Sequence, residues 1–401
     1  MRMDANIRID SQFLFAFICM IRIGVDARSL EGERTGVGRY LYELLKEWKQ
    51  NALSQAQFYL YFKKEIPSDI AKDFTAPAFI LKRLPTFFGR PSNAFFLHIA
   101  FPWALRNDRT AHAFCPAYVA PFVSPVPFSV TIHDIVYSAR PELYFWPSRI
   151  DRFLLPWLSA RSARRAVKIF APSQFTKSEI MKVWKIPEEK IVVTPEGVGD
   201  EFFARTDETL LIRERYGISA PFFLYVGSIF TRRHVAECIR AFEKIAQEFL
   251  DLQFFIAGKD RTRPPVYIDR VVQETNKQLG RNAVIRVDFI EPHLLPAVMR
   301  SAFAVVWLSD YEGFGLPALE AMASGTPLVT SHAGSLPEVV GNTAIVVSNP
   351  DDVREVLQAF RSVVSDETLR QQLRDAGSAR ARLFTWKSCA QQTRNAILDT
   401  L

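Results

Sequence analysis

The stretch Ser309-Asp-Tyr-Glu-Gly-Phe-Gly-Leu-Pro-Ala-Leu-Glu-Ala-Met-Ala-Ser-Gly-Thr-Pro-Leu-Val329 decides how this chain is expected to fold. It follows an apolar run from Ala302 to Leu308, which predicts a buried strand. Gly313 and Gly315 predict a tight loop, and Pro317 suits the first turn of a short helix. An apolar segment then follows the helix. The succession of strand, loop, helix and strand is the unit from which α/β proteins are built.

The loop and the start of this helix bring backbone amides together with two carboxylates. Because the glycines remove side chains, the amides of Phe314, Gly315 and Leu316 are expected to point at an anion bound at the helix N-terminus. Glu312 lies in the loop, and Glu320 is expected in the first turn of the helix. One carboxylate can then face a ligand's reacting end and the other its hydroxyl groups. Two acids beside a phosphate site suggest a nucleotide sugar.

The stretch resembles the Glu-x7-Glu motif of retaining glycosyltransferases of family 4, and Glu312 and Glu320 have that spacing. Two acids alone could be a helix-capping residue and a surface residue. The full string Glu-Gly-Phe-Gly-Leu-Pro-x-x-Glu-Ala-Met-Ala-x-Gly-x-Pro favours the motif. The resemblance runs over nearly the whole chain, roughly Ile21 to Leu401. It implies the α/β GT-B fold, in which two Rossmann-like, doubly wound parallel-sheet domains face a cleft.

Length and charge agree with a two-domain protein that meets anions. A chain of 401 residues is too long for one ordinary core. With 50 Lys and Arg against 43 Asp and Glu, a net charge of +7 favours nucleotide phosphates or an acidic membrane surface as partners. Nucleic acid is the weaker expectation because no DNA-reading motif is present. The arginines at positions 161, 164 and 165 are interpreted as a solvated helix face.

Four segments are expected along the chain. The apolar run Phe13 to Ile23 is too short to span a bilayer and lacks a convincing signal cleavage site. Met20 opens a string that often begins members of the family, so the residues before it are interpreted as a non-native extension. The expected ranges are 1–19 for that extension, 20–200 for an N-terminal acceptor-side domain, 201–383 for a C-terminal nucleotide-sugar domain, and 384–401 for a helix that crosses back to the first domain.

The first domain opens with a predicted strand from Ile21 to Asp26 and a Gly-x-Gly loop at Gly36 and Gly38, followed by a helix. Dinucleotide sites occupy the same place in Rossmann folds. Leu41 replaces the third glycine of the nicotinamide fingerprint, which argues against a dehydrogenase. In the family that the chain resembles, this loop approaches the donor diphosphate and helps to shape the acceptor site. The resemblance therefore implies donor binding by the two glycines.

A second predicted strand begins at Phe128 and delivers His133 and Asp134 into the crevice at its carboxyl end. An isolated His is usually packed in a core, but this position raises the expectation of a function. The segment resembles the family's Thr-x-His-Asp string, in which the His lies near the donor sugar and the acceptor hydroxyl. Asp134 is expected to orient the loop or to cap a helix.

The segment Thr194-Pro-Glu-Gly-Val-Gly leaves the first domain. Relatives usually carry Asn-Gly-Val-Asp there, so Glu196 and Gly199 depart from the family pattern. The departure is expected to change only the local hydrogen bonds of the linker.

Arg232 and Arg233 follow the predicted first strand of the second domain and precede a helix. Two cations at such a turn can neutralise a diphosphate leaving group, because guanidinium grips phosphate oxygens with two hydrogen bonds. The alternative is a pair of solvated arginines. The string resembles the family's Gly-x-x-x-x-Arg-Lys-Asn, with Arg233 at the Lys position and His234 at the Asn position. The pair is interpreted as a phosphate clamp.

The region between Leu84 and Pro127 is rich in aromatic residues and proline, with interspersed arginines. Aromatic rings beside cations suit a membrane interface that carries lipid-linked acceptors. The alternative is buried helix core, which is favoured for Phe95 to Trp103. The residues concerned are Phe87, Phe88, Phe95, Phe96, Phe101, Trp103, Tyr118 and Phe122 with Arg83, Arg90, Arg106 and Arg109.

The sequence therefore predicts a retaining hexosyltransferase with His133 and Glu312 as catalytic residues and Glu320 on the nucleotide ribose. Mannose from a guanosine donor is the expected sugar, and the acceptor is a hydroxyl of a glycan or lipid-linked molecule. No metal and no cofactor besides the nucleotide sugar is expected. Four widely spaced cysteines fit a reduced, cytoplasmic setting, with peripheral contact at the inner membrane left open. A sugar epimerase and a non-catalytic nucleotide- or glycan-binding relative remain the alternatives.

Overall fold

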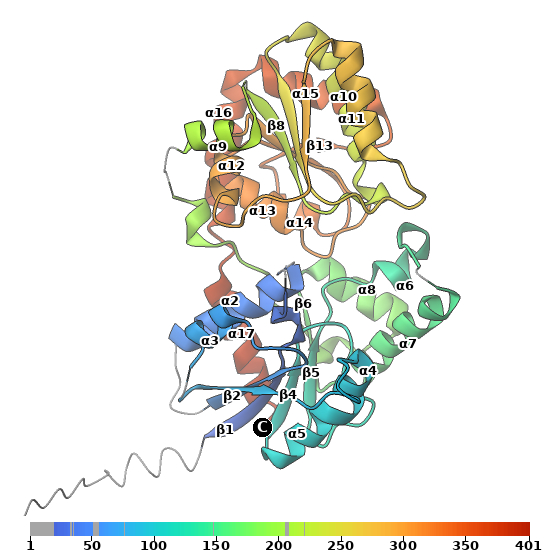
Figure 1. Ribbon diagram of the computed structural model, residues 1–401, viewed down its shortest axis with the longest axis vertical. Helices are drawn as coiled ribbons and strands as arrows, with labels where there is room; N and C mark the ends of the chain where they lie inside the picture. Colours follow the sequence, from blue (N-terminus) through green and yellow to red (C-terminus); the bar gives the residue numbers. More distant parts are fainter. Residues whose placement is uncertain are drawn as a thin grey trace, which may run out of the picture.

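The protein is described from a computed structural model (Figure 1). The structure describes residues 20–32, 34, 36–50, 56–75, 77–146, 148–204, 208–219 and 221–401. The extension expected at 1–19 lies outside these residues. Two lobes are stacked along the long axis of the molecule, the first half of the chain in the lower lobe and the second half in the upper one (Figure 1).

The lower lobe contains a parallel sheet whose strand order is β3-β2-β1-β4-β5-β6-β7. Alternate residues of β2 belong to different cores: Phe58 and Leu60 pack in one hydrophobic cluster, and Tyr59 and Tyr61 pack in the other. Because side chains alternate across a strand, this pattern places helices on both faces of the sheet. The strands are β1 (Ile21–Asp26), β2 (Ala56–Phe62), β3 (Phe79–Arg83), β4 (His112–Cys115), β5 (Phe128–Thr131), β6 (Lys168–Ala171) and β7 (Ile191–Val193).

Helices of very different length cover this sheet. They are η1 (Arg28–Leu30), α2 (Gly36–Gln50), α3 (Ser68–Asp73), α4 (Asn93–Phe95), η2 (Phe96–Ala100), α5 (Phe101–Asn107), α6 (Val136–Ala139), η3 (Pro141–Leu143), α7 (Arg149–Arg165), α8 (Gln174–Trp184) and η4 (Glu188–Lys190). The short helix η5 (Asp200–Phe202) lies in the linker, and its Phe202 packs in the core of the upper lobe. Ser173 caps α8 and accepts a hydrogen bond from the Thr176 amide.

The upper lobe has a second parallel sheet of order β10-β9-β8-β11-β12-β13. Its strands are β8 (Phe222–Val226), β9 (Gln253–Ala257), β10 (Val284–Val287), β11 (Ala304–Trp307), β12 (Leu328–Ser331) and β13 (Ile345–Val347). Its helices are α9 (Thr209–Tyr216), η6 (Thr231–Arg233), α10 (Val235–Glu248), α11 (Ile268–Leu279), α12 (Leu295–Ser301), α13 (Leu316–Ala323), α14 (Leu336–Val340), α15 (Val353–Ser365) and α16 (Glu367–Ala381). Two parallel sheets with helices on their faces confirm the predicted α/β architecture.

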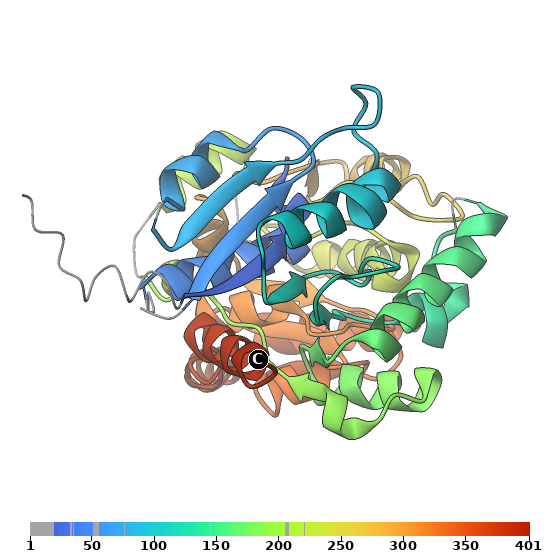
Figure 2. The same cartoon turned by 90° about the horizontal axis from the view of Figure 1, so that it is seen from below.

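The chain ends in the lobe where it began. Helix α17 (Trp386–Leu398) packs on α2, and the Trp48 indole donates a hydrogen bond of 2.9 Å to the Ala390 carbonyl. Figures 1 and 2 both show this red helix in the first lobe. A Cβ built on Gly197 would lie 2.1 Å from the Trp386 amide nitrogen. The two crossings between the lobes are therefore packed directly against each other.

Two local expectations were wrong in detail. Gly36 and Gly38 lie in the first turn of α2 and not in a loop before it. Glu320 is the fifth residue of α13 and lies beyond the first turn. For α2 the helix begins earlier than the glycines suggested, since such residues mark element ends only to within a few residues. For α13 the start agrees with the prediction from Gly315 and Pro317, and only the position of Glu320 along the helix was misjudged.

The aromatic region divides between core and surface. Phe96 and Phe101 are buried, as favoured for that segment, whereas Trp103 is 57% exposed and Phe88 is 89% exposed. Helix α7 adds an exposed apolar stripe that the sequence reading did not single out. Among the described residues, no helix is long and apolar enough to span a bilayer.

Candidate active site

The loop between β11 and α13 is held by hydroxyl groups at the end of β12 and in the segment that follows it. Ser331 donates a hydrogen bond of 2.6 Å to the Ser309 carbonyl. Ser335 donates to the carbonyl of Glu312 at 3.1 Å and to that of Phe314 at 2.8 Å. These bonds satisfy the carbonyls of a buried loop and so fix the direction of the Glu312 side chain.

The N-terminus of α13 keeps the geometry expected of an anion site. Gly315 precedes the helix with φ +104°, a backbone conformation that favours glycine. No side chain caps this end of the helix. Phe314 is buried and Leu316 is half-buried. Because the first amides of a helix lack partners within the helix, those of Phe314, Gly315 and Leu316 are positioned as donors at the loop.

Glu312 pairs with Arg233 of the same domain. The Arg233 Nη2 atom lies 3.1 Å from Glu312 Oε1 and 3.4 Å from Oε2. The guanidinium also lies 4.0 Å from the ring centroid of Trp307 at the end of β11. Burial alone lowers the pKa of Arg233, but the Glu312 charge raises it, and the net direction is upward. The arginine is thus a fixed cation at the motif loop.

Arg232 lies beside the same group of residues. Its guanidinium is 4.4 Å from the ring centroid of Phe230, and its backbone carbonyl accepts a hydrogen bond of 3.0 Å from the Asp310 amide. Burial raises the pKa of Asp134, while the Val136 amide and the charge of Arg232 act to lower it. Asp134 also accepts hydrogen bonds from the Val136 amide and the Tyr118 hydroxyl, which is the loop-orienting role expected of it.

Glu320 pairs with a residue of the other domain. Arg39 reaches from α2 and its Nη1 atom contacts Glu320 Oε1, with Glu201 of the linker at 3.9 Å from Nη2. Only 4% of the Glu320 side chain is exposed. Burial raises the pKa of Glu320, and the Arg39 charge opposes that rise. Since a buried carboxylate needs a partner, Arg39 offsets part of the cost of burying this acid.

His133 pairs with the linker. Its Nδ1 atom lies 3.1 Å from Glu196 Oε1, and its Nε2 atom lies 2.9 Å from the Pro116 carbonyl oxygen. The ring also meets Tyr40 edge-on, with centroids 4.8 Å apart. Both members of the His133–Glu196 pair are buried. The effect of Glu196 is therefore not confined to the local hydrogen bonds of the linker, which corrects the expectation from sequence.

The two domains are in contact at the motif loop. A Cβ built on Gly313 would lie 1.9 Å from the His133 carbonyl oxygen. Ser173 donates a hydrogen bond of 2.6 Å to the Gly313 carbonyl. Glu338 of the second domain accepts hydrogen bonds from the first amides of α8, at 3.0 Å from Gln174 and 3.2 Å from Phe175. The structure therefore brings His133 against the loop that carries Glu312.

His234 joins the arginine turn to the motif stretch. It has φ +51°, and its two ring nitrogens lie 2.8 Å from Asp310 Oδ1 and 3.1 Å from Asp351 Oδ1. Burial acts to lower the pKa of His234, but the two carboxylates raise it overall. The residue at the family's Asn position thus bridges two carboxylates, one of which belongs to the motif stretch.

Gly36 and Gly38 lie at the edge of this arrangement. Gly36 is exposed with open space around its Cα, whereas a Cβ on Gly38 would lie 2.4 Å from the Ser29 carbonyl oxygen. The second glycine therefore permits close packing of α2 on η1. The side chain that this turn sends toward the motif is that of Arg39.

Sequence reasoning missed Arg39 and Glu196 as site residues. Arg39 directly follows the Gly-x-Gly string, in which only the glycines were assigned a role. Glu196 was noticed as a departure from the family pattern, which was the available signal. A charged residue that replaces a neutral one at a domain junction requires a partner, and that partner is His133.

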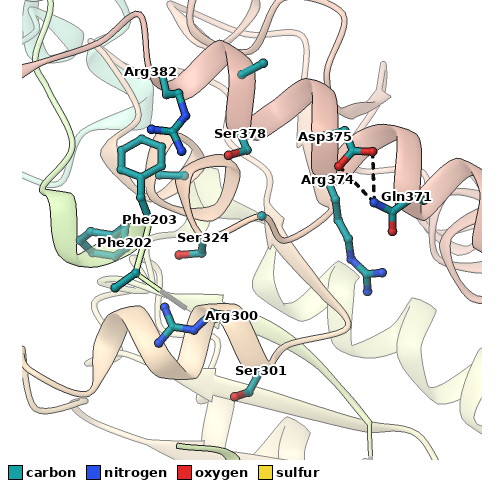
Figure 3. A pocket seen from close by; sticks show the side chains of 14 residues that line it. Phe202, Phe203, Arg300, Ser301, Ser324, Gln371, Arg374, Asp375, Ser378 and Arg382 are labelled. Carbon is teal, nitrogen blue, oxygen red and sulfur yellow. Dashed lines mark hydrogen bonds between the residues drawn. The ribbon is translucent and has the colours of Figure 1, made fainter. Parts of the chain in front are cut away.

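A separate cavity of about 690 Å³ lies at the other end of α13 (Figure 3). It is lined by side chains from the linker, α12 and α16, among them Phe203, Arg300, Ser324, Arg374 and Arg382. Because Ser324 follows the C-terminus of α13 and Gly315 precedes its N-terminus, the helix separates this cavity from the motif loop. None of the residues that line this cavity is among those described above at the motif loop.

Possible metal ligands do not cluster in the described part of the chain: no group of three or more His, Cys, Asp or Glu residues could hold an ion there. Cys115, Cys238 and Cys389 are buried free thiols. Burial raises the pKa of all three, so they are not poised as nucleophiles.

Two Rossmann-like domains that meet at a Glu-x7-Glu loop define a glycosyltransferase of the GT-B class. The model for group 1 glycosyl transferases matches residues 211–380, and the model for Glycosyltransferase Family 4 matches residues 34–202. The chain belongs to this family of group 1, family 4-like glycosyltransferases.

Individual relatives agree with this assignment. The chain is 29% identical to O-antigen chain mannosyltransferase B of Escherichia coli over 304 residues, 73% of this chain and 76% of that protein. It is 26% identical over 262 residues to the serotype-specific mannosyltransferase WbdA of Escherichia coli, 64% of this chain but 32% of the relative. The solved sucrose-phosphate synthase of Thermosynechococcus elongatus has the same fold, with a TM-score of 0.73, 20% identity, and coverage of 95% and 99%.

Proposed function

We propose that the protein transfers a hexose from a nucleoside diphosphate sugar to a hydroxyl group, with retention of anomeric configuration. The acceptor is a glycan or a lipid-linked molecule of cell-surface polysaccharide or lipopolysaccharide synthesis. The observation that carries this proposal is the contact of His133 with Gly313, because it sets the first domain against the loop that holds Glu312. A donor bound on that loop would have its sugar at the junction of the two domains.

The leaving diphosphate is the group that this site is best suited to stabilise. Arg232 and Arg233 supply two cations, and the amides at the start of α13 supply hydrogen-bond donors. Preorganised donors and charges of this kind lower the barrier as charge develops on the leaving group. We propose that they do so without a metal ion, so that transfer persists in the presence of a chelator.

The two glutamates have different roles in this proposal. Glu320 would accept hydrogen bonds from the nucleotide ribose, and Glu312 would hold or stabilise the donor sugar. His133 would lie next to the sugar and the incoming hydroxyl. Gly36 and Gly38 would let the first turn of α2 approach the donor.

Mannose from a guanosine donor is proposed as the transferred sugar. The support is the similarity to O-antigen chain mannosyltransferase B and to WbdA, which are named for mannose transfer. An O-antigen chain is also a cell-surface polysaccharide, which agrees with the proposed acceptor class.

We propose that the first domain meets an anionic lipid surface where a lipid-linked acceptor is held. Four large apolar side chains of α7 are exposed at helical spacing: Ile150, Phe153, Leu154 and Trp157. Arg149 and Arg152 lie on the same half of the helix and are exposed. Figure 2 shows this green helix along an outer edge of the molecule. An apolar stripe beside cations is complementary to anionic lipid.

The lipid contact is tested by co-sedimentation with vesicles of phosphatidylglycerol and phosphatidylcholine. Replacing Phe153 and Trp157 together by Ser should reduce binding to the anionic vesicles, while binding to pure phosphatidylcholine vesicles is weak throughout. Equal binding of the variant and the wild type would exclude α7 as the lipid-binding surface.

The transfer itself is tested by incubating the protein with a panel of nucleotide sugars and a lipid-linked or glycan acceptor, and measuring nucleoside diphosphate release. We expect release with GDP-mannose, no effect of EDTA, and strong suppression in Glu312→Ala and Arg233→Ala. The Glu189→Gln variant, a change of one exposed carboxylate in the first domain, is the matched control. NMR of the anomeric proton of the product determines whether configuration is retained.

The alternatives give different results in the same assay. An epimerase would change the donor sugar without any acceptor. A non-catalytic relative would bind a nucleotide sugar without releasing nucleoside diphosphate. If no donor binds at all, the proposal is wrong.

A further inference from the structure

Both ring nitrogens of His133 face hydrogen-bond acceptors. The Pro116 carbonyl oxygen, 2.9 Å from Nε2, has no hydrogen to donate, so Nε2 must carry a proton. On the other side, Nδ1 lies 3.1 Å from Glu196 Oε1. A neutral imidazole with an ionised Glu196 would leave a lone pair facing an oxygen at one of these two contacts. The contacts are satisfied only if a second proton lies between Nδ1 and the carboxylate.

From this geometry we propose that Glu196 is a positioning residue for His133: it shares a proton with Nδ1 and keeps both ring nitrogens engaged. The imidazole is then held as a hydrogen-bond donor on both sides and has no lone pair for the acceptor hydroxyl. This inference rests on the proposed sugar transfer and adds that His133 is not its general base.

The consequence for the reaction concerns the acceptor proton. As the acceptor oxygen bonds to the anomeric carbon, the bond from that carbon to the diphosphate oxygen breaks. The proton of the acceptor hydroxyl then goes to the leaving diphosphate, whose oxygens gain the electron pair. No proton passes through His133, and the charge of the His133–Glu196 pair does not change.

The pair lies where three parts of the chain meet, so Glu196 can transmit the position of the linker to the site. Tyr40 of α2 meets the His133 ring with centroids 4.8 Å apart, and Tyr118 meets it at 5.8 Å. Asp134 is the next residue in the chain after His133. The charge of Glu196 also acts to raise the pKa of Glu320 in the second domain and that of Cys389 in α17. These are the titratable groups around the pair, together with Arg39, which is bound to Glu320.

The His133–Glu196 pair affects the site through the main-chain carbonyl of His133. Its carbonyl lies against Gly313, so a ring that rotated would disturb the loop at the domain contact. A fixed ring holds that carbonyl, and with it the spacing between the first domain and the Glu312 loop. Misplacement of such a contact by about 1 Å is enough to slow a reaction by about 100-fold.

The test begins with the protonation state, which does not depend on catalysis. ¹⁵N NMR of histidine-labelled protein, with the His133 signal assigned from a His133→Gln spectrum, should show both ring nitrogens protonated near neutral pH. In Glu196→Gln the side-chain amide can donate to Nδ1, so we expect a neutral ring with a proton on Nε2 alone. In Glu196→Asp, which keeps the carboxylate, the doubly protonated ring should persist.

Kinetics with the donor identified in the release assay tests the positioning role. Glu196→Gln should lower kcat by about 10-fold to 100-fold, the range typical of a residue that orients a functional histidine, with little change in KM for the donor. Glu196→Asp should recover part of the loss. The kcat of the wild type should stay level through the pH range where free imidazole titrates, whereas that of Glu196→Gln should vary. Glu189→Gln should behave as the wild type, and a thermal melt of each variant confirms that it is folded.

Two results would overturn the inference. A wild-type spectrum with an unprotonated Nδ1 would show that the pair holds no shared proton. An unchanged kcat and pH profile in Glu196→Gln would show that the pair has no part in positioning. If instead the wild type releases no nucleoside diphosphate from any donor, the proposed function fails, while the spectrum still decides whether Glu196 protonates His133.

Discussion

Glu312 and Glu320 belong to one motif and are eight residues apart, yet their partners come from different domains. Glu312 pairs with Arg233, which lies in the same domain as itself. Glu320 pairs with Arg39, which is carried by α2 of the other domain. The motif therefore contains one acid whose surroundings are assembled within its own domain and one whose surroundings depend on the contact between the two.

The difference between the two acids distinguishes donor binding from closure of the two domains. The second domain alone contains Glu312, Arg233 and the amides at the start of α13, which are the groups proposed to bind the diphosphate and the sugar. The Glu320 side chain is 4% exposed and its charged partner Arg39 comes from the first domain, so this pair exists only where the two domains meet. If this distinction is correct, changes around the two acids should have effects of different kinds.

The largest effect is expected from Glu312→Gln. This change keeps the size of the side chain but removes the charge that faces Arg233 and the donor sugar. Loss of one preorganised group of this kind costs about 1,000-fold in kcat. We expect that loss in the nucleoside diphosphate release assay, with donor affinity by calorimetry nearly unchanged because Arg233 and the helix amides remain.

Glu338→Gln serves as the control for that experiment, since the side-chain oxygens of this glutamate accept hydrogen bonds from the first amides of α8 and its main-chain bond to Arg380 is unaffected by the change. It should reduce transfer far less. Equal losses in the two variants would mean that any carboxylate near the domain contact affects the rate, and Glu312 would lose its special role.

A smaller effect is expected from Gly313→Ala, which acts on closure alone. The new Cβ would lie 1.9 Å from the His133 carbonyl oxygen and 2.9 Å from the Asp134 Cβ atom, so the domains must move apart. A shift of about 1 Å costs about 100-fold in rate. The Glu312–Arg233 pair lies within one domain and should survive, so donor binding is expected to persist while transfer slows.

Small-angle scattering is the companion measurement. Gly313→Ala should have a larger radius of gyration than the wild type, and Gly325→Ala, beyond the far end of α13 where no atom lies within 4 Å of a new Cβ, should not. Since Gly325 has φ +66°, the control strains its own turn without touching the first domain. No expansion in Gly313→Ala together with full activity would contradict the closed contact.

The same division decides what the sequence could predict. Glu312, Gly315 and Pro317 are close together in the chain, so their spacing alone predicts a strand, a loop and a helix with an acid at its start. His133 was predicted because a strand end in a parallel sheet always faces the crevice. These inferences use local sequence and a general rule of topology.

Arg39 and Glu196 could not be assigned in this way. Arg39 meets Glu320 across 281 positions of the chain, and Glu196 meets His133 across 63. Such contacts depend on how two domains and a linker are placed, which no local pattern encodes. The start of α2 at Gly36 was also misjudged, because glycine marks the end of an element only to within a few residues.

Arg39→Ala is expected to have a smaller effect on transfer than either change above. It removes the charge-assisted hydrogen bond to Glu320, an interaction worth about 1.5 to 3 kcal/mol, and we expect kcat/KM for the donor to fall about 10-fold. A double-mutant cycle with Glu320→Gln should show strong coupling. The cycle of Arg39→Ala with Glu312→Gln should be close to additive, because these residues lack a shared partner. Coupling of equal size in both cycles would remove the distinction between the two acids.

The smallest effect concerns the dependence of stability on pH. Burial raises the pKa of Glu320 above its ordinary value of 4.5, with Arg39 opposing the rise. The folded protein therefore holds a proton that the unfolded chain has already released, so the contribution to stability is complete below about pH 4.5 and is lost as the pH rises through the folded pKa.

Glu320→Gln cannot release that proton, so its Tm relative to the wild type should increase as the pH is raised through this window. Adding Arg39→Ala should extend the window upward, since the opposing charge is gone. Glu189→Gln, a change of one exposed carboxylate in the first domain, is the control. A flat difference for Glu320→Gln would mean that this acid is as well solvated as a surface carboxylate, and the domain contact at Arg39 would then be open in solution.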